Sequence, residues 1–151
     1  MGLFDKLKGM KNAVTGGGAK VTIEVGQGTR GQDIPVVVRA VGKANFQITS
    51  VYLLVRGMER IEIKDTDWDD GRKTTETIRK THATFEQRFE VAGAQTIEDG
   101  GEYAWEAVFQ VPDTAFPSIK GRYIEHVWQV QAGLDAKGND PDSGWLELHV
   151  K

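Results

Sequence analysis

Residues 103–111 read Tyr-Ala-Trp-Glu-Ala-Val-Phe-Gln-Val, which is the most regular alternation of side chains in the chain. Its apolar odd positions are Tyr103, Trp105, Ala107, Phe109 and Val111. Because successive side chains of a β-strand point to opposite faces, this pattern predicts a strand with one buried face. A longer run of the same period follows at residues 124–134, where apolar side chains occupy the even positions.

Alternation of this kind covers most of the remaining sequence, at residues 21–25, 33–41, 46–63, 77–91 and 146–150. Between 46 and 63 the apolar positions change from even to odd at Thr49-Ser50, which predicts a bulge. Pro35 has no N–H to donate, which predicts that its strand starts at a sheet edge. Val, Ile and Thr together number 36, and the 18 glycines are typical of many tight turns. We predict an all-β, two-layer antiparallel sandwich of the immunoglobulin-like type, with a closed barrel as the alternative.

Length and composition restrict the classes of protein to consider. A chain of 151 residues is the size of one domain. The lack of cysteine excludes disulfides, zinc–thiolate sites and thiol nucleophiles. A net charge of −3 argues against a nucleic-acid partner. No apolar run reaches the roughly 18 residues of a membrane span. We therefore expect a cytoplasmic globular protein whose contact with membranes, if any, is peripheral.

The N-terminus has a different pattern. Residues 1–15 combine an apolar helical face with lysines and predict a short amphipathic helix, followed by a glycine hinge at 16–19 and the sandwich domain at 20–151. Such a helix could bind an anionic membrane surface or a partner, or it could pack on its own sandwich. The predicted contact residues are Leu3, Phe4, Lys6, Leu7, Lys8, Met10 and Lys11.

A family resemblance lies between Gly101 and Leu134. The regular strand is followed by Pro112, a Phe116-Pro117-Ser118 loop, Gly121, and a long strand with an aromatic residue, a valine and small residues. This arrangement resembles the arrestin-like superfamily, in its N-terminal type of sandwich. The basic amphipathic N-terminus is similar to the bacterial sporulation-control branch of that superfamily. The resemblance implies an arrestin-like β-sandwich and a scaffold that recruits proteins, often near a membrane.

From this resemblance we expect a non-enzymatic adaptor or regulator that acts through protein–protein binding. Its candidate partners are other proteins, a second copy of the chain, and an anionic membrane surface, and no cofactor is expected. Superfamily members carry two sandwiches in tandem, so functions of a cleft between two sandwiches are not implied for this chain. The strand that starts near Pro35 is one candidate for β-strand addition by a partner.

An acidic segment at residues 65–76 suggests an alternative function. Asp65, Asp67, Asp69 and Glu76 occupy positions 1, 3, 5 and 12 of an EF-hand-like spacing, although Gly71 comes one position late. The other interpretation is a solvated acidic hairpin loop. A second acidic loop, residues 135–142, has a composition that turn formation explains. Together these loops leave open a calcium-dependent or carbohydrate-binding module.

The remaining aromatic and histidine residues complete the candidate sites. Trp68 and Trp145 are predicted to be exposed, and an exposed tryptophan can anchor a partner or stack on a sugar. His126 falls on the apolar positions of its strand and is predicted to be a buried, hydrogen-bonded structural residue. His82 and His149 are predicted to be exposed. No Gly-x-Ser-x-Gly motif occurs, and no catalytic residue is assigned.

Overall fold

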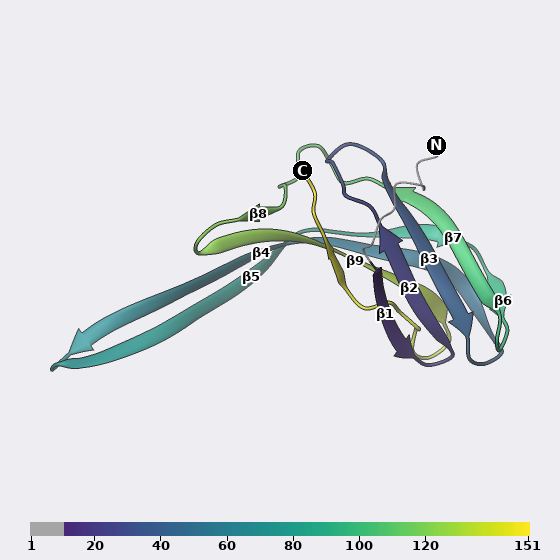
Figure 1. Ribbon diagram of the computed structural model, residues 1–151, viewed down its shortest axis with the longest axis horizontal. Helices are drawn as coiled ribbons and strands as arrows, with labels where there is room; N and C mark the ends of the chain where they lie inside the picture. The colour runs from purple at the N-terminus through teal and green to yellow at the C-terminus, as the bar shows by residue number, and fades with distance from the viewer. Residues whose placement is uncertain (1–10) are drawn as a thin grey trace.

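The computed structural model describes residues 11–151, which form ten β-strands and no helix. Two sheets pack face to face at one end of the molecule, and a long hairpin extends from one of them (Figure 1). The all-β, antiparallel prediction is confirmed. The strands are β1 (Lys11–Gly16), β2 (Ala19–Val25), β3 (Ile34–Gly42), β4 (Phe46–Asp69), β5 (Arg72–Ala92), β6 (Gln95–Ile97), β7 (Glu102–Phe109), β8 (Ile119–Lys120), β9 (Ile124–Ala136) and β10 (Leu146–Leu148).

The short sheet has the order β1-β2-β3-β7. Its strand β3 lies between β2 and β7, and Pro35 is paired with Val108 of β7. The prediction that Pro35 marks a sheet edge is therefore wrong, and so is the strand-addition site inferred from it. Pro35 is the second residue of β3, so its missing N–H affects only the end of the ladder and an interior position is tolerated.

The long sheet has the order β10-β9-β4-β5, with β8 beside β9 and β6 beside β4. Strands β4 and β5 contain 24 and 21 residues and pair from Val51–Ala92 out to Asp69–Arg72. The pairing of β4 with β9 shifts register between Ile48 and Ser50. The bulge predicted at Thr49-Ser50 is confirmed by this shift, which turns the apolar side chains after it toward the core.

The core lies between the two sheets and is almost entirely aliphatic. Val, Ile, Leu and Ala side chains from β2, β3, β4 and β9 are fully or nearly fully buried. Trp128 of β9 is the largest fully buried side chain, and its ring lies 5.4 Å from that of Phe85 on β5. Nonlocal strand pairing around an aliphatic core is what the alternating sequence pattern requires.

The structure does not confirm the helix predicted for residues 1–15. Residues 1–10 lie outside the described residues, and residues 11–16 form β1, which pairs antiparallel with β2 from Lys11–Glu24 to Gly16–Ala19. The predicted glycine hinge is instead a two-residue hairpin turn, with Gly17 at a φ of +52°. A helix of about three turns is marginal in isolation, whereas pairing completes the hydrogen bonds at the edge of β2.

Candidate binding surface on the projecting arm

The candidate functional surface is a hairpin arm, residues 59–82, that leaves the body of the sandwich (Figure 1). The ladder between β9 and β4 ends at the pair Ile61–Ile124, and beyond it β4 and β5 continue as a two-stranded ribbon. Every residue from 61 to 82 is exposed. Because a two-stranded ribbon buries little apolar area, these side chains are placed for surface contacts rather than for the core.

A tight turn closes the arm at Asp70-Gly71. Both residues have positive φ, +49° for Asp70 and +75° for Gly71, as a two-residue type I′ hairpin turn requires. An aspartate followed by glycine is the residue pair that such a turn favours. The hairpin interpretation of this acidic segment is confirmed, but the turn is only two residues long.

The cross-strand register sorts the side chains of the arm onto two faces. The odd residues of β4 before the arm, such as Val55, face the core, and their continuation defines what we call the inner face. A register shift after Gly57 places even residues of β5 opposite odd residues of β4. The inner face carries Glu59, Ile61, Ile63, Asp65, Asp67, Asp69, Arg72, Thr74, Glu76, Ile78, Lys80 and His82. The outer face carries Arg60, Glu62, Lys64, Thr66, Trp68, Lys73, Thr75, Thr77, Arg79 and Thr81.

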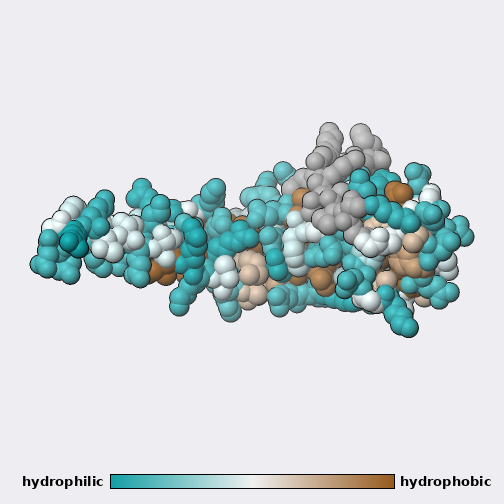
Figure 2. Space-filling model, turned by 90° about the horizontal axis from the view of Figure 1, so that it is seen from below, coloured by the Kyte–Doolittle hydropathy of each residue, from teal (hydrophilic) through white to brown (hydrophobic). Residues whose placement is uncertain are grey.

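The inner face carries an exposed apolar patch near the base of the arm. In Figure 2 a hydrophobic area interrupts the largely hydrophilic surface of the arm. Ile61 is opposite Ile124 and Ile63 is opposite Ile78, while Ile119 is opposite the core-facing His126. Residues directly opposite each other share a face, so these isoleucines lie on one face of the sheet, and we call them the isoleucine patch. Its members and their exposed fractions are Ile61 39%, Ile63 40%, Ile78 41%, Ile119 48% and Ile124 57%.

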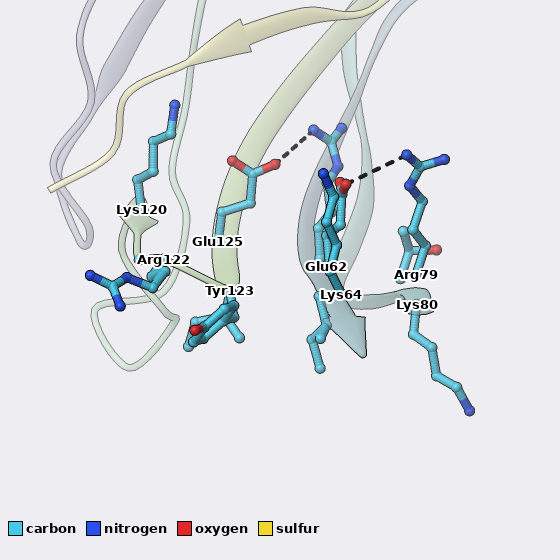
Figure 3. Close-up of a pocket in the computed structure, with 13 residues that line it drawn as sticks. Glu62, Lys64, Arg79, Lys80, Lys120, Arg122, Tyr123 and Glu125 are labelled. Carbon is cyan, nitrogen blue, oxygen red and sulfur yellow. Dashed lines mark hydrogen bonds and ion pairs between the residues drawn. The ribbon is translucent and has the colours of Figure 1, made fainter. Parts of the chain in front are cut away.

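The outer face forms one wall of an open groove of about 600 Å³, and the β8–β9 turn forms the other wall (Figure 3). Two ion pairs lie in the groove: Arg60 Nη1 to Glu125 Oε1 at 3.3 Å joins β4 to β9, and Arg79 Nη2 to Glu62 Oε1 at 3.5 Å joins the two strands of the arm. Both pairs are partly solvent-exposed and therefore contribute little to stability. The lining contains six cations and two carboxylates, namely Arg60, Lys64, Arg79, Lys80, Lys120 and Arg122 with Glu62 and Glu125.

A buried histidine connects the base of the arm to the sandwich. His126 is 5% exposed, its Nδ1 lies 3.0 Å from the Pro117 carbonyl, and its Nε2 lies 2.7 Å from Thr84 Oγ1. A carbonyl oxygen only accepts, so Nδ1 is the donor. Gly57 leaves room for this contact, because a Cβ there would crowd both partners. The prediction of a structural His126 is confirmed, as is exposure of His82 and His149.

The Pro-Ser loop closes the same end of the sandwich. The Trp128 indole Nε1 donates to the Phe116 carbonyl at 2.8 Å. Ser118 is bonded twice to the C-terminal segment, from its N–H to the Val150 carbonyl at 2.7 Å and from the Val150 N–H to its Oγ at 2.9 Å. The motif that carried the family resemblance thus holds the last residues of the chain against the arm end of the long sheet.

The acidic residues proposed for calcium do not form a binding loop. Asp65, Asp67 and Asp69 lie on β4 and Glu76 lies on β5, directly opposite Asp65. Since a strand rises about 3.3 Å per residue, Asp65 and Asp69 are roughly 13 Å apart, whereas oxygen ligands surround calcium at about 2.4 Å. Among residues 11–151 no three His, Asp or Glu side chains converge on a metal position. The acids therefore do not form a calcium loop: they line one face of a solvent-exposed hairpin, as the alternative interpretation states.

The two tryptophans proposed as exposed anchors differ. Trp68 is 72% exposed near the tip of the arm, as predicted. Trp145 is only partly exposed, because the guanidinium of Arg56 lies 3.8 Å from the centre of its ring. The expected exposure of Trp145 is therefore not observed, and a cation–π contact occupies one of its faces. Trp68 is the tryptophan that remains available for a partner.

The second acidic loop is organised by hydrogen bonds to its own carboxylates. Asp140 accepts from the Tyr52 hydroxyl at 2.7 Å and from the Ala136 N–H at 3.0 Å, and Asp142 accepts from the Gly144 N–H at 2.8 Å. Burial, followed by the hydrogen bond to Asp140, raises the pKa of Tyr52 well above its usual value of 10.0. The interpretation of residues 135–142 as a turn built by its Asx residues is confirmed.

Most of the predicted N-terminal contact residues lie outside the residues that the structure describes. Leu3, Phe4, Lys6, Leu7, Lys8 and Met10 precede residue 11, and Lys11 is the first residue of β1. No helix within residues 11–151 is long and apolar enough to cross a bilayer.

Sequence reasoning missed the isoleucine patch and the sorting of charges on the arm. The alternation predicts a strand through Ile61 and Ile63, but the acidic residues that follow do not continue it. The threonines at 74, 75, 77 and 81 were the available signal, because β-branched residues favour strands and could have extended β5 to residue 72. The faces themselves depend on the register shift beside Gly57, which the sequence alone does not reveal.

Comparison with known proteins gives a structural match only. No family model matches the chain, and no curated protein matches it. The crystal structure of Spo0M, a sporulation control protein from Bacillus subtilis, superposes with a TM-score of 0.61 at 23% sequence identity. The match covers 89% of this chain and 50% of that one, so this chain spans about half the length of that protein. This likeness confirms the predicted resemblance, and the chain has an arrestin-like fold similar to that of this sporulation control protein.

Proposed function

We propose that this protein is a non-enzymatic regulatory adaptor that binds a protein partner through the inner face of its arm. The observation that carries the proposal is the isoleucine patch, a cluster of large apolar side chains on a projecting ribbon. Exposed apolar clusters rimmed by polar residues are typical of interaction sites. The likeness to a sporulation control protein supports a regulatory role, and the absence of cysteine suits the cytoplasm.

The charges around the patch define the chemistry of the partner. Moving outward along the inner face, Ile63 and Ile78 are followed by the directly opposed pair Asp65 and Glu76, and then by Asp67. A complementary partner presents aliphatic side chains flanked by lysine or arginine. Such a partner would cover the isoleucines and relieve the repulsion between the opposed carboxylates.

Two neighbouring positions allow a matched test of this face. A photo-crosslinking amino acid that replaces Ile63 reports on the inner face. The same amino acid in place of Lys64, one position away, reports on the outer face. We expect crosslinks from Ile63 to one defined protein and few from Lys64, and mass spectrometry identifies the product. Crosslinks between two copies of this chain would identify the partner as a second copy on the same surface.

Affinity for the purified partner then decides the proposal. Ile63→Asp should weaken binding at least about 30-fold, the loss typical of a central apolar contact. Val108→Asp on β7 is the control, because Val108 is similarly exposed at 44% but belongs to the short sheet. Calorimetry in which Ile63→Asp binds as tightly as the unmodified chain would refute the assignment of this face.

The N-terminal segment belongs to the same proposal as a contact with an anionic membrane. Leu3, Phe4 and Leu7 supply apolar side chains, and Lys6 and Lys8 supply positive charge. One short segment of this kind gives only marginal membrane binding, so stable attachment needs a second contact.

A further inference from the structure

We infer that the outer face of the arm, together with the β8–β9 turn, is a second contact surface for an anionic membrane. The inference rests on the membrane part of the proposed function and names the surface that part requires. It does not involve the isoleucine patch, so partner binding and membrane binding can succeed or fail separately.

The first support is the separation of charge between the two faces of the arm. The outer face carries four cations and one carboxylate, whereas the inner face carries five carboxylates and two cations. The chain as a whole has a net charge of −3, so the positive outer face is a local feature. The outer-face charges are Arg60, Lys64, Lys73 and Arg79 with Glu62, and the inner-face charges are Glu59, Asp65, Asp67, Asp69 and Glu76 with Arg72 and Lys80.

The second support is the pair of aromatic residues that accompanies these cations. Trp68, 72% exposed, lies opposite Lys73 near the tip of the arm. Tyr123, 55% exposed, lies at the base, where its carbonyl accepts a hydrogen bond from the Glu62 N–H at 2.9 Å. Tryptophan and tyrosine favour the headgroup region of a bilayer, because each combines an apolar ring with a polar group.

The third support is the continuation of positive charge into the β8–β9 turn. Lys120 is opposite Glu125, which is opposite Arg60, so Lys120 lies on the same side of the sheet as the outer face. Figure 3 shows Lys120, Arg122 and Tyr123 gathered on the turn beside the groove, while Lys80 points away. A row of cations with interfacial aromatics at both ends complements a negatively charged bilayer.

A membrane fits these observations better than a nucleic acid does. The acidic inner face lies directly behind the ribbon and would repel a polyanion that surrounds the arm. A lipid bilayer, in contrast, can contact the basic outer face without touching the acidic inner face.

Adjacent residues on β5 provide variants with the same change in charge. The test variant is Lys73→Glu on the outer face, and the control is Arg72→Glu on the inner face. Both positions are exposed, and they are adjacent on the same strand. The full chain is sedimented with phosphatidylcholine vesicles that contain or lack phosphatidylserine.

We expect the unmodified chain to bind only vesicles with phosphatidylserine, and the outer-face variant to lose at least about tenfold in partition coefficient. The inner-face control should bind within about twofold of the unmodified chain, because its charges face away from the bilayer. Equal loss in both variants would show dependence on net charge alone and would overturn the inference. Absence of binding by the unmodified chain, or tighter binding to duplex DNA, would overturn it too.

Two further variants separate this surface from the N-terminus and from simple electrostatics. If Leu3→Asp with Phe4→Asp abolishes binding while the outer-face variant retains it, the N-terminus alone is the contact and the inference fails. Trp68 supplies a spectroscopic measurement, since vesicles with brominated lipid should quench its fluorescence. The quenched signal should disappear in Trp68→Phe, and unchanged quenching in that variant would contradict contact at the tip of the arm.

Discussion

At the scale of single residues, Gly42 shows how closely the loops of the short sheet approach one another. The Gly42 N–H donates to the Gly101 carbonyl at 2.9 Å, and its own carbonyl accepts from the Gly100 N–H at 2.9 Å. A Cβ at Gly42 would overlap the carbonyl oxygen of Glu98. Since that atom belongs to the backbone of a hydrogen-bonded turn, it cannot move aside without breaking these bonds.

Gly42→Ala should therefore lower the free energy of unfolding by about 3 kcal/mol, the upper part of the range for forced overpacking. Gly93→Ala is the control, because nothing lies within 4 Å of a Cβ placed there and its φ is not positive. It should be neutral or slightly stabilising. Urea unfolding of both variants measures the difference, and equal stabilities would contradict the close approach at Gly42.

Tyr52 is a second residue whose surroundings give a measurable consequence. It is 6% exposed, its hydroxyl donates to Asp140, and Arg88 lies 4.1 Å from its ring centre. Burial and the carboxylate raise its pKa above the usual 10.0. A pKa that is raised on folding means that the contribution to stability is complete below pH 10 and is lost as pH increases above it.

Tyr52→Phe should cost about 2 kcal/mol at neutral pH, because a hydrogen bond to a charged group is lost. Above pH 10 the stability of the unmodified chain should fall more steeply than that of the variant, so the difference between them narrows. Chemical denaturation from pH 7 to about pH 11 tests this. If the difference in stability stays constant with pH, folding does not raise the pKa of Tyr52, and the prediction is contradicted.

At the scale of elements, side-chain alternation predicted the strands, whereas the order of the strands and the pairing of residues 11–15 depend on contacts far apart in the sequence. The strand at residues 103–111 and the bulge at Thr49-Ser50 both depend on neighbouring residues, and both predictions are confirmed. Pro35 was misplaced because a proline shows that one N–H is missing but not which strands flank it. Residues 11–15 were misassigned because their pairing with β2 is a tertiary contact.

The conformation of the arm, too, depends on long-range pairing that the sequence does not show. The acidic residues of β4 match the spacing of a calcium loop as letters in a sequence, yet in an extended strand they form a row along one face. Whether such a segment bends around an ion or extends depends on its pairing with β5. The candidate surface thus follows from register, and the sequence alone supplied only Trp68 and the acids.

At the scale of the whole molecule, the sandwich and the arm differ in how they are packed. The sandwich buries its aliphatic core between two sheets and anchors the arm through His126 and Thr84. The arm presents an acidic face with isoleucines on one side and a basic face with aromatics on the other. We propose that a protein partner binds one face of the arm and an anionic membrane the other.

Removing the arm tests this proposal directly. Joining Ile61 to Lys80 through Asp70-Gly71 deletes residues 62–69 and 72–79 and preserves the turn, since Ile61 and Lys80 are already opposite each other. Circular dichroism should show a folded sandwich with a thermal midpoint close to that of the full chain.

The decisive measurement is sedimentation of this armless chain with phosphatidylserine vesicles beside the full chain. We predict a loss of at least about tenfold in binding while the sandwich remains folded. Vesicle binding equal to that of the full chain would contradict the proposal that the arm is the binding element.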